Sequence, residues 1–207
     1  MIVVHHLNNS RSQRILWLLE ELGQPYEIKR YQRDATTNLA PESLKAVHPL
    51  GKSPVITDDG QTVSESGTIV EYLIRKYGRD KLMPPEDSAA FVPYLHWMHY
   101  AEGSAMLPVM LTLYTMRLGD AAAPLRPRLE SEIQNHFGYM ERELGSRGFF
   151  VGNELSGADF QITFVLEAAK SLGLLAPFSG LNAYLDRMHA RPAYMRGVER
   201  GGRYDLG

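Results

Sequence analysis

The sequence predicts two domains, a small α/β domain followed by an all-α helical domain. Short strand-like runs, which are β-branched or alternate apolar with polar residues, occur before residue 80. A segment rich in proline and charge follows them at 81–87. Beyond that segment every convincing apolar pattern has helical spacing. The expected organisation is therefore a first domain at 1–80, a linker at 81–87 and a helical domain at 88–207.

The first domain is expected to open with a strand, a helix and a second strand. Residues 2–4 form a β-branched apolar run, which is typical of a buried strand. Residues 12–22 carry leucine and isoleucine at helical spacing, and Gly23 is a suitable stop. Residues 25–31 alternate apolar with polar side chains and predict the second strand. Because a helix connects the two strands, we expect them to be parallel.

A hairpin and a further helix are expected to complete this domain. The stretch 32–47 mixes charged and turn-forming residues, which predicts irregular structure with a short helix near 41–45. The runs 54–57 and 61–63 flank an Asp-Asp-Gly sequence, which indicates an antiparallel hairpin. Apolar periodicity predicts a helix at 66–77. The order β-α-β then β-β-α therefore predicts a small mixed sheet covered by helices.

The second domain is expected to contain helices alone. Apolar periodicity and the positions of prolines predict them at 88–118, 124–145, 157–172 and 179–190. Ser156 and Asp159 have capping-box spacing at the start of the third helix, where each side chain can bond the other's free main-chain N–H. We interpret both as folding residues. Residues 200–207 either fold over a site or remain loose, and the sequence leaves both alternatives open.

Composition excludes several classes of function. The formal net charge of −2 over 207 residues lacks the basic excess that nucleic-acid binding requires. There are no cysteines, so a disulfide, a thiolate metal site and a protein thiol nucleophile are all excluded. The apolar run at the N-terminus is too short for a signal sequence, and no stretch approaches a membrane span. We expect a cytoplasmic protein that binds no metal, no nucleic acid and no membrane.

The Ser53-Pro54 pair opens a predicted strand, where proline costs no interior ladder bond. In the cis form it would turn the chain so that Val55 offers its N–H and C=O to an extended peptide. The alternative is an ordinary trans proline at a strand edge, which is the commoner state of an X–Pro bond. The pair thus predicts either a peptide-binding edge or a simple strand start.

Charged and polar groups near the same predicted edge could bind the ends of such a peptide. The N–H and hydroxyl of Ser66, at a helix start, suit a carboxylate, and the Glu65 carboxylate suits an ammonium group. Lys52 could bind a second carboxylate from the turn that begins at His48. The alternatives are a plain helix cap beside a solvated Glu65, a solvated Lys52, and a loop hydrogen bond from His48.

These segments resemble sequences of one family, the cytosolic glutathione S-transferases. The sequence His-Pro-Leu-Gly-Lys-Ser-Pro-Val at 48–55, followed by Glu-Ser-Gly-Thr-Ile at 65–69, is similar to the family's glutathione-binding signature. Residues 10–22 resemble the first helix of its serine-type bacterial and fungal members, and 152–159 resembles its buried capping box. The resemblance extends over nearly the whole chain.

The resemblance implies a thioredoxin-like first domain, glutathione as co-substrate and a homodimer. The residues that would bind glutathione are His48, Lys52, Ser53, Pro54, Val55, Glu65 and Ser66. Small hydrophobic electrophiles would bind against the helical domain. Met106, Met110 and Tyr114 are candidates there, because methionine and aromatic side chains suit a permissive apolar pocket. The alternative for such residues is packing between helices.

The thiol of glutathione needs activation, because with a pKa of about 8.5 only roughly 3% of it is thiolate at pH 7. A hydroxyl near a helix N-terminus can stabilise the thiolate by donating a hydrogen bond. The resemblance implies Ser10, which lies four residues before Arg14 as in serine-type members. Ser12 is the first rival, and Asn9 and His6 have donors that could serve instead.

The expected function is conjugation of the glutathione thiolate to hydrophobic electrophiles. Glutathione-dependent reduction of peroxides or disulfides is a chemically close alternative, because the same thiolate attacks oxygen or sulfur. A non-catalytic glutathione-transferase-like binding protein is a further alternative, because a fold does not fix a function.

Overall fold

The structure is a computed structural model that describes residues 1–78, 81–202 and 204–206. The chain divides into two compact units, Met1–Lys81 with His189–Leu206 and Leu82–Met188. The domain boundary expected at residue 80 lies outside the described residues and stays a prediction. The sequence predicted that all of residues 88–207 would belong to the helical domain. In the structure, His189–Leu206 belongs to the first unit instead.

The first unit contains a four-stranded mixed sheet in the order β2-β1-β3-β4. Its strands are β1 (Ile2–Leu7), β2 (Tyr26–Tyr31), β3 (Val55–Asp58) and β4 (Gln61–Ser64). Strand β1 is parallel to β2 and antiparallel to β3, and β3 is antiparallel to β4. The prediction of a β-α-β unit followed by a β-β-α unit is confirmed.

Helices α1 (Gln13–Leu22) and α2 (Ser66–Tyr77) belong to this unit, as the sequence predicted. Helix α1 buries nearly its whole first two turns, and Gly23 ends it in the left-handed conformation with φ 64°. The short helix expected near 41–45 is a single 3-10 turn at Glu42–Leu44.

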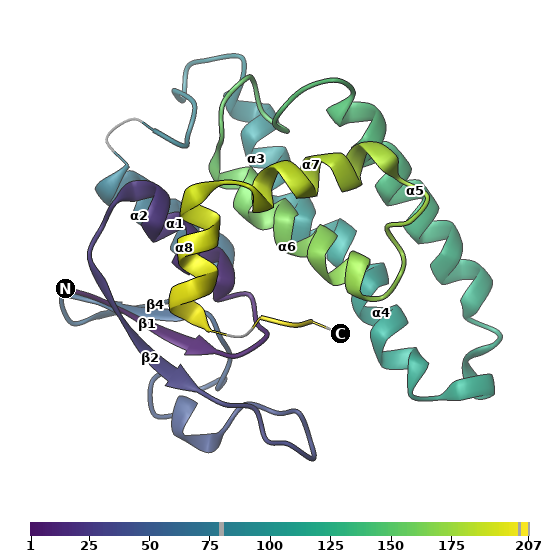
Figure 1. Cartoon of the computed structure of the whole chain (residues 1–207), viewed down its shortest axis with the longest axis horizontal. Helices are drawn as coiled ribbons and strands as arrows, with labels where there is room; N and C mark the ends of the chain where they lie inside the picture. The colour runs from purple at the N-terminus through teal and green to yellow at the C-terminus, as the bar shows by residue number, and fades with distance from the viewer. Residues whose placement is uncertain (79–80, 203, 207) are drawn as a thin grey trace. The chain divides into compact units, whose positions relative to one another are not determined.

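A helix that the sequence did not predict, α8 (Pro192–Gly201), packs against α1 in the first unit (Figure 1). Glycine disfavours a helix, but the glycine at position 197 allows α8 to approach α1 closely. A Cβ at that position would lie 3.0 Å from the main-chain nitrogen of Trp17 and 3.1 Å from its Cα. Ion pairs from Arg191 to Glu21, at 2.6 Å, and from Arg196 to Glu20, at 2.9 Å, hold the two helices together.

The segment after α8 belongs to the same unit. The N–H of Asp205 donates to Asn9 Oδ1 at 2.8 Å, so this part of the expected tail lies against the loop that follows β1. Residues 203 and 207 of the expected 200–207 tail lie outside the described residues.

The second unit is helical, as predicted. Its elements are α3 (Phe91–Tyr100), a π-helical segment (Ala101–Ala105), α4 (Met106–Met116), a 3-10 segment (Gly119–Ala122), α5 (Arg126–Leu144), α6 (Gly157–Ser171) and α7 (Ser179–His189). The single helix expected at 88–118 is thus two α-helices joined by a π-helical turn. Helix α6 is buried along most of its length and packs against α3 and α4. Among the described residues, no helix combines the length and the apolar character that a membrane span needs.

Candidate functional site

Three serines meet where strand β1 ends and helix α1 begins. Ser10 Oγ lies 2.8 Å from Ser12 Oγ and 3.4 Å from Ser53 Oγ. Ser12 is fully buried, whereas Ser10 keeps 5% of its surface exposed. The two candidates for thiol activation are therefore hydrogen-bonded to each other, and only Ser10 has exposed surface.

The Ser53–Pro54 peptide bond is cis, which is one of the two alternatives that the sequence left open. The register does not fit the expectation that Val55 offers its main chain to a peptide. Val55 pairs with His5 on β1 and with Ser64 on β4, so its N–H and C=O lie within the ladder whichever strand they face. Ser53 precedes β3, and its side chain is held by a bond from Ser53 Oγ to the carbonyl of His5 at 3.0 Å. Ser53 lies before the first residue of the β3 ladder, so a peptide would pair with the main chain at Ser53 and not at Val55.

A buried cation lies behind the start of helix α2. Arg14 is only 2% exposed and donates from Nη1 to Ser66 Oγ at 2.9 Å. Ser66 is the first residue of α2, and Glu65 before it has φ 68°. A positive φ is costly for a residue with a side chain and is concentrated at functional sites. The helix N-terminus and the Arg14 charge together favour an anion at this position.

The remaining predicted glutathione residues border the same end of the sheet. His48 Nε2 lies 3.2 Å from Ser64 Oγ at the end of β4, and Lys52 is exposed in the loop before β3. Neither position tests the predicted role. Within the described residues, no three His, Asp or Glu side chains cluster as a metal site would require.

Two adjacent histidines of β1 face different surroundings. His5 Nδ1 lies 3.1 Å from the Tyr31 hydroxyl, whereas His6 Nδ1 lies 2.8 Å from Ser12 Oγ. Burial lowers the pKa of His5, and Lys29 lowers it further. Burial and then Arg30 lower the pKa of His6 to about 4, against an opposing hydrogen bond to the Gly201 main chain. His6 is therefore a neutral ring at pH 7.

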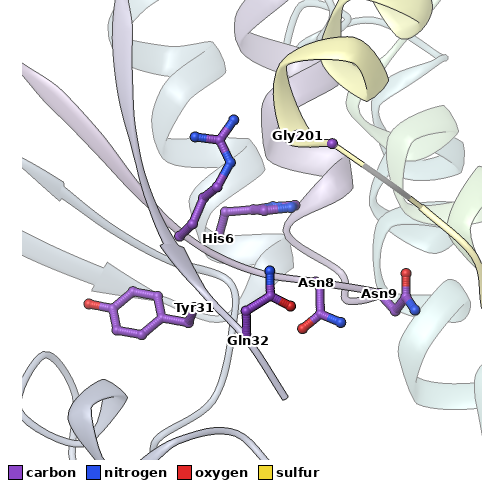
Figure 2. A pocket seen from close by; sticks show the side chains of 8 residues that line it. His6, Asn8, Asn9, Tyr31, Gln32 and Gly201 are labelled. Carbon is purple, nitrogen blue, oxygen red and sulfur yellow. The ribbon is translucent and has the colours of Figure 1, made fainter. Parts of the chain in front are cut away.

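A cavity of about 350 Å³ in the first unit lies beside His6 (Figure 2). It is lined by His6, Asn8, Asn9, Arg30, Tyr31, Gln32, Gly201 and Gly202. None of the predicted glutathione-binding residues is among them, but His6 and Asn9, two rivals for thiol activation, are. No sequence pattern predicted this cavity, because one of its walls is the end of helix α8, which was itself not predicted.

The three electrophile candidates share one face of helix α4 in the second unit, at intervals of four residues. Met106 is buried, Met110 is half-buried and Tyr114 is 60% exposed. Met106 therefore serves packing, and Tyr114 is the candidate that is most open to a ligand.

The predicted folding residues of the second unit form a closed cluster. Asp159 Oδ2 accepts from the Ser156 N–H at 2.9 Å and from its hydroxyl at 3.0 Å. Asp159 Oδ1 accepts from the Phe150 N–H at 3.2 Å and from the Tyr184 hydroxyl at 2.8 Å. Burial raises the pKa of Asp159, and these hydrogen bonds oppose the rise. The carboxylate therefore accepts four hydrogen bonds from protein groups, which is a structural role.

The fold and this site define a class of protein in which a thioredoxin-like sheet carries a serine and a cis-proline loop, and a helical unit follows in the chain. Two protein-family models match the chain. Residues 1–75 match the model described as "Glutathione S-transferase, N-terminal domain", and residues 108–194 match "Glutathione S-transferase, C-terminal domain". The chain belongs to the glutathione S-transferase family.

Individual relatives are similar over most of their lengths. Glutathione S-transferase 3 of Schizosaccharomyces pombe is 36% identical, and the match covers 97% of this chain and 88% of the relative. Glutathione S-transferase 1 of Saccharomyces cerevisiae is 29% identical over 97% of this chain and 95% of the relative. The crystal structure of a glutathione S-transferase from Actinobacillus pleuropneumoniae has a TM-score of 0.88 at 33% identity, covering 100% of this chain and 94% of that one.

Sequence reasoning missed two contributions to the site. Arg14 contributed to the sequence prediction only through its distance of four residues from Ser10. Nothing in the sequence distinguishes a buried arginine from an exposed one. The contact between His6 and Ser12 joins residues six apart across a turn, and no periodic pattern predicts such a pair.

Proposed function

We propose that this protein is a glutathione transferase that conjugates the thiolate of glutathione to small hydrophobic electrophiles. One observation carries the proposal. The same unit brings together the Ser10 hydroxyl, the Ser53 loop and the Ser66 helix start backed by the buried Arg14. These three features suit the thiol, the central main chain and the charged head of one extended tripeptide.

The γ-glutamyl head would bind at the start of α2. Its carboxylate would accept from the N–H and hydroxyl of Ser66, with the Arg14 charge behind them, and its ammonium would pair with Glu65. The cysteinyl main chain would bond to Ser53, while Pro54 and Val55 shape the floor beneath it. The glycyl carboxylate would lie near Lys52 and His48.

Ser10 would stabilise the thiolate by donating its hydroxyl hydrogen to the sulfur. Lowering the thiol pKa by about two units requires roughly 2.7 kcal/mol, which a charge-assisted bond near a helix N-terminus can supply. Exposure favours Ser10 over Ser12, because Ser12 is fully buried and bonds to His6 and to the Leu7 carbonyl. Asn9 stays a rival, because the bond that its Oδ1 accepts from Asp205 leaves its Nδ2 donor available.

A homodimer is part of the proposal. Helix α4 and the segment after it expose a row of large apolar side chains at intervals of three or four residues, namely Leu107, Leu111, Tyr114 and Leu118. A surface of this kind is compatible with association. Support for glutathione as the bound molecule also comes from a similar fold, a sphingomonad glutathione S-transferase whose structure is complexed with glutathione, at a TM-score of 0.80 and 24% identity.

The test compares wild type with Ser10→Ala. We expect wild type to be retained on immobilised glutathione and to conjugate a halogenated aromatic. Ser10→Ala should bind glutathione with similar affinity, because the ends of the tripeptide are held elsewhere, but turn over about 100-fold more slowly, as when one charge-stabilising donor is removed. A wild-type protein with no calorimetric signal for glutathione and no conjugation would refute the proposal. Activity with organic peroxides but not with electrophiles would favour the reductase alternative.

A further inference from the structure

A hydrogen-bond chain leads from the proposed thiol site into the interior of the first unit. Ser10 Oγ lies 2.8 Å from Ser12 Oγ, and Ser12 Oγ lies 2.8 Å from His6 Nδ1. All three side chains are at most 5% exposed. The other side of the His6 ring faces the end of α8, where Gly201 lies, and the ring borders the cavity (Figure 2).

Each bond is assigned one direction. We assign the ring hydrogen of neutral His6 to Nε2, because Nδ1 is the nitrogen that contacts Ser12 Oγ. A neutral imidazole carries one hydrogen, so Nδ1 is an acceptor and Ser12 donates to it. Ser12 then accepts from Ser10 in the 2.8 Å contact, and the Leu7 carbonyl and Ser53 Oγ, at 3.3 and 3.4 Å, are longer, competing acceptors for the two hydroxyl hydrogens. At rest the chain runs from Ser10 through Ser12 to His6, and Ser10 presents a lone pair to an arriving thiol.

We propose that the thiol proton of glutathione leaves through this chain, with His6 as the group that receives it. The inference rests on the proposed function. Ser10 touches the sulfur, and Ser12 and His6 are positioning residues that act through it.

The transfer balances in atoms and charge. The S–H proton moves to Ser10 Oγ as the Ser10 hydrogen moves to Ser12 Oγ and the Ser12 hydrogen moves to His6 Nδ1. The S–H bond breaks, an N–H bond forms, and thiolate and imidazolium result with no change in oxidation state. Every hydrogen bond is then reversed, so the Ser10 hydroxyl donates to the thiolate. The same event removes the proton and turns the stabilising donor toward the sulfur.

His6 does not keep the proton. Burial and Arg30, the charged group that faces the ring from β2, disfavour imidazolium, while Ser12 from α1 and Gly201 from α8 contribute only uncharged groups. The imidazolium is therefore a transient species that loses its Nε2 hydrogen to solvent water in the cavity it borders, which leaves a neutral ring with the hydrogen on Nδ1. The resting arrangement returns after the conjugate leaves, when Nε2 takes a proton from water and one proton passes back along the chain to Ser10. A weak terminal base suits a proton exit, because a strong one would remain charged.

Substitutions separate proton transfer from hydrogen bonding. Ser12→Ala interrupts the chain, and Ser12→Thr restores the hydroxyl. His6→Asn keeps an oxygen that can accept from Ser12 but cannot take up a proton near neutral pH. His5→Asn is the matched control, because His5 is the adjacent residue with the same 5% exposure and bonds to Tyr31 outside the chain.

The measurement is the rate at which thiolate ultraviolet absorbance appears after rapid mixing with glutathione, with calorimetric affinity measured on every variant. We expect Ser12→Ala and His6→Asn to slow thiolate formation at least about tenfold at unchanged affinity, because proton transfer by a placed group is worth about 100-fold or more. Ser12→Thr should recover much of the rate that Ser12→Ala loses, and His5→Asn should match wild type. We also expect the wild-type rate to show a solvent deuterium isotope effect that Ser12→Ala reduces.

Each outcome bears on the inference. Wild-type rates in Ser12→Ala would overturn the chain. A wild-type rate in His6→Asn with a slow Ser12→Ala would overturn proton acceptance by His6 and leave a hydrogen-bonding role. If wild type binds glutathione, forms thiolate and conjugates the halogenated aromatic, the proposed function stands whichever way the variants behave. If wild type forms no thiolate, the proposed function and this inference fail together.

Discussion

Two buried polar clusters, one in each unit, differ in whether they close on themselves. In the second unit, Asp159 accepts from the main chain of Ser156 and Phe150 and from the Tyr184 hydroxyl, and all these partners are protein groups. In the first unit, the chain from His6 through Ser12 reaches Ser10, a residue that is 5% exposed and whose further contact, to Ser53 Oγ, is longer at 3.4 Å. One cluster is closed, and the other is open at both ends.

The two clusters differ in their roles: the closed cluster serves folding, and the open chain serves function. Buried polar groups are normally satisfied within the protein, and a network that is complete makes the structure specific and rigid. A chain that ends at a partly exposed serine, with its other end beside a cavity, retains capacity for a ligand. Breaking the closed cluster should therefore cost stability, whereas breaking the open chain should change kinetics more than stability.

The largest expected effect is from Asp159→Ala. The substitution leaves the Phe150 N–H and the Tyr184 hydroxyl without their acceptor and removes the cap of helix α6. Buried unsatisfied groups cost about 1–3 kcal/mol each, so the free energy of unfolding should fall by about 4 kcal/mol. Urea unfolding monitored by circular dichroism measures it. Turnover per folded molecule should be unchanged.

The matched control for this change is Asp186→Ala. Asp186 is 69% exposed and its pairing with Lys170, at 3.4 Å, is a surface contact, so stability should change by less than about 0.5 kcal/mol. Equal losses for Asp159→Ala and Asp186→Ala would contradict the structural role of the closed cluster.

His6, a member of the open chain, should make the free energy of unfolding of the protein dependent on pH. Its folded pKa, about 4, lies below the ordinary value of 6.5, so the unfolded chain binds a proton more readily between these values. The contribution of His6 is therefore full above pH 6.5 and declines as pH falls toward 4, by about 3 kcal/mol in total.

The measurement compares the free energy of unfolding of wild type and His6→Asn at several pH values. Carboxyl groups titrate in both proteins, so their effects largely cancel in the difference. We expect the stability of His6→Asn to fall less steeply with acid across this window. Parallel curves would show that His6 titrates alike in the folded and unfolded chain.

A smaller effect is expected where α8 contacts α1. Gly197→Ala would place a methyl group 3.0 Å from the main-chain nitrogen of Trp17, which cannot turn aside as a side chain can. Overpacking against main chain should destabilise by about 2 kcal/mol.

Gly138→Ala in α5 is the control, because its Cβ meets only the mobile end of the Arg142 side chain, at 3.3 Å. Its better helix propensity should stabilise the protein by up to about 1 kcal/mol. If thermal unfolding gives the two variants the same sign, α8 does not pack as closely as the structure indicates.

The sequence predicted local elements better than contacts between distant ones. The strands, the hairpin and most helices follow from apolar periodicity and turn residues, and so does the capping-box spacing of Ser156 and Asp159. Helix α8 was missed because Gly197 and Gly201 weaken a helical pattern. The reason for these two glycines is visible only in the folded structure, where α1 packs closely against them.

The site was predictable in its residue types but only partly in its geometry. Ser10 precedes α1, Ser53 precedes β3 and Ser66 begins α2, as the motifs predicted, and their roles stay predictions. The availability of Val55 depended on strand order. The sequence predicted a hairpin containing Val55, but not that β1 would pair with its other side. Burial of Arg14 and the contact of His6 with Ser12 likewise depend on tertiary packing, for which a single sequence has no local signal.

The smallest expected effect comes from surface charge, which belongs to neither cluster. Arg196 is half-exposed and pairs with Glu20 at 2.9 Å, but Arg200 and the Tyr26 hydroxyl bond to the same carboxylate. Arg196→Ala therefore leaves Glu20 satisfied, and the free energy of unfolding should fall by only about 0.5 kcal/mol, with less loss in high salt. Lys170→Ala in the second unit should cost as little. A loss from Arg196→Ala as large as that from Gly197→Ala would mean that charge, and not the close approach of the helices, holds α8 beside the chain that ends at Ser10.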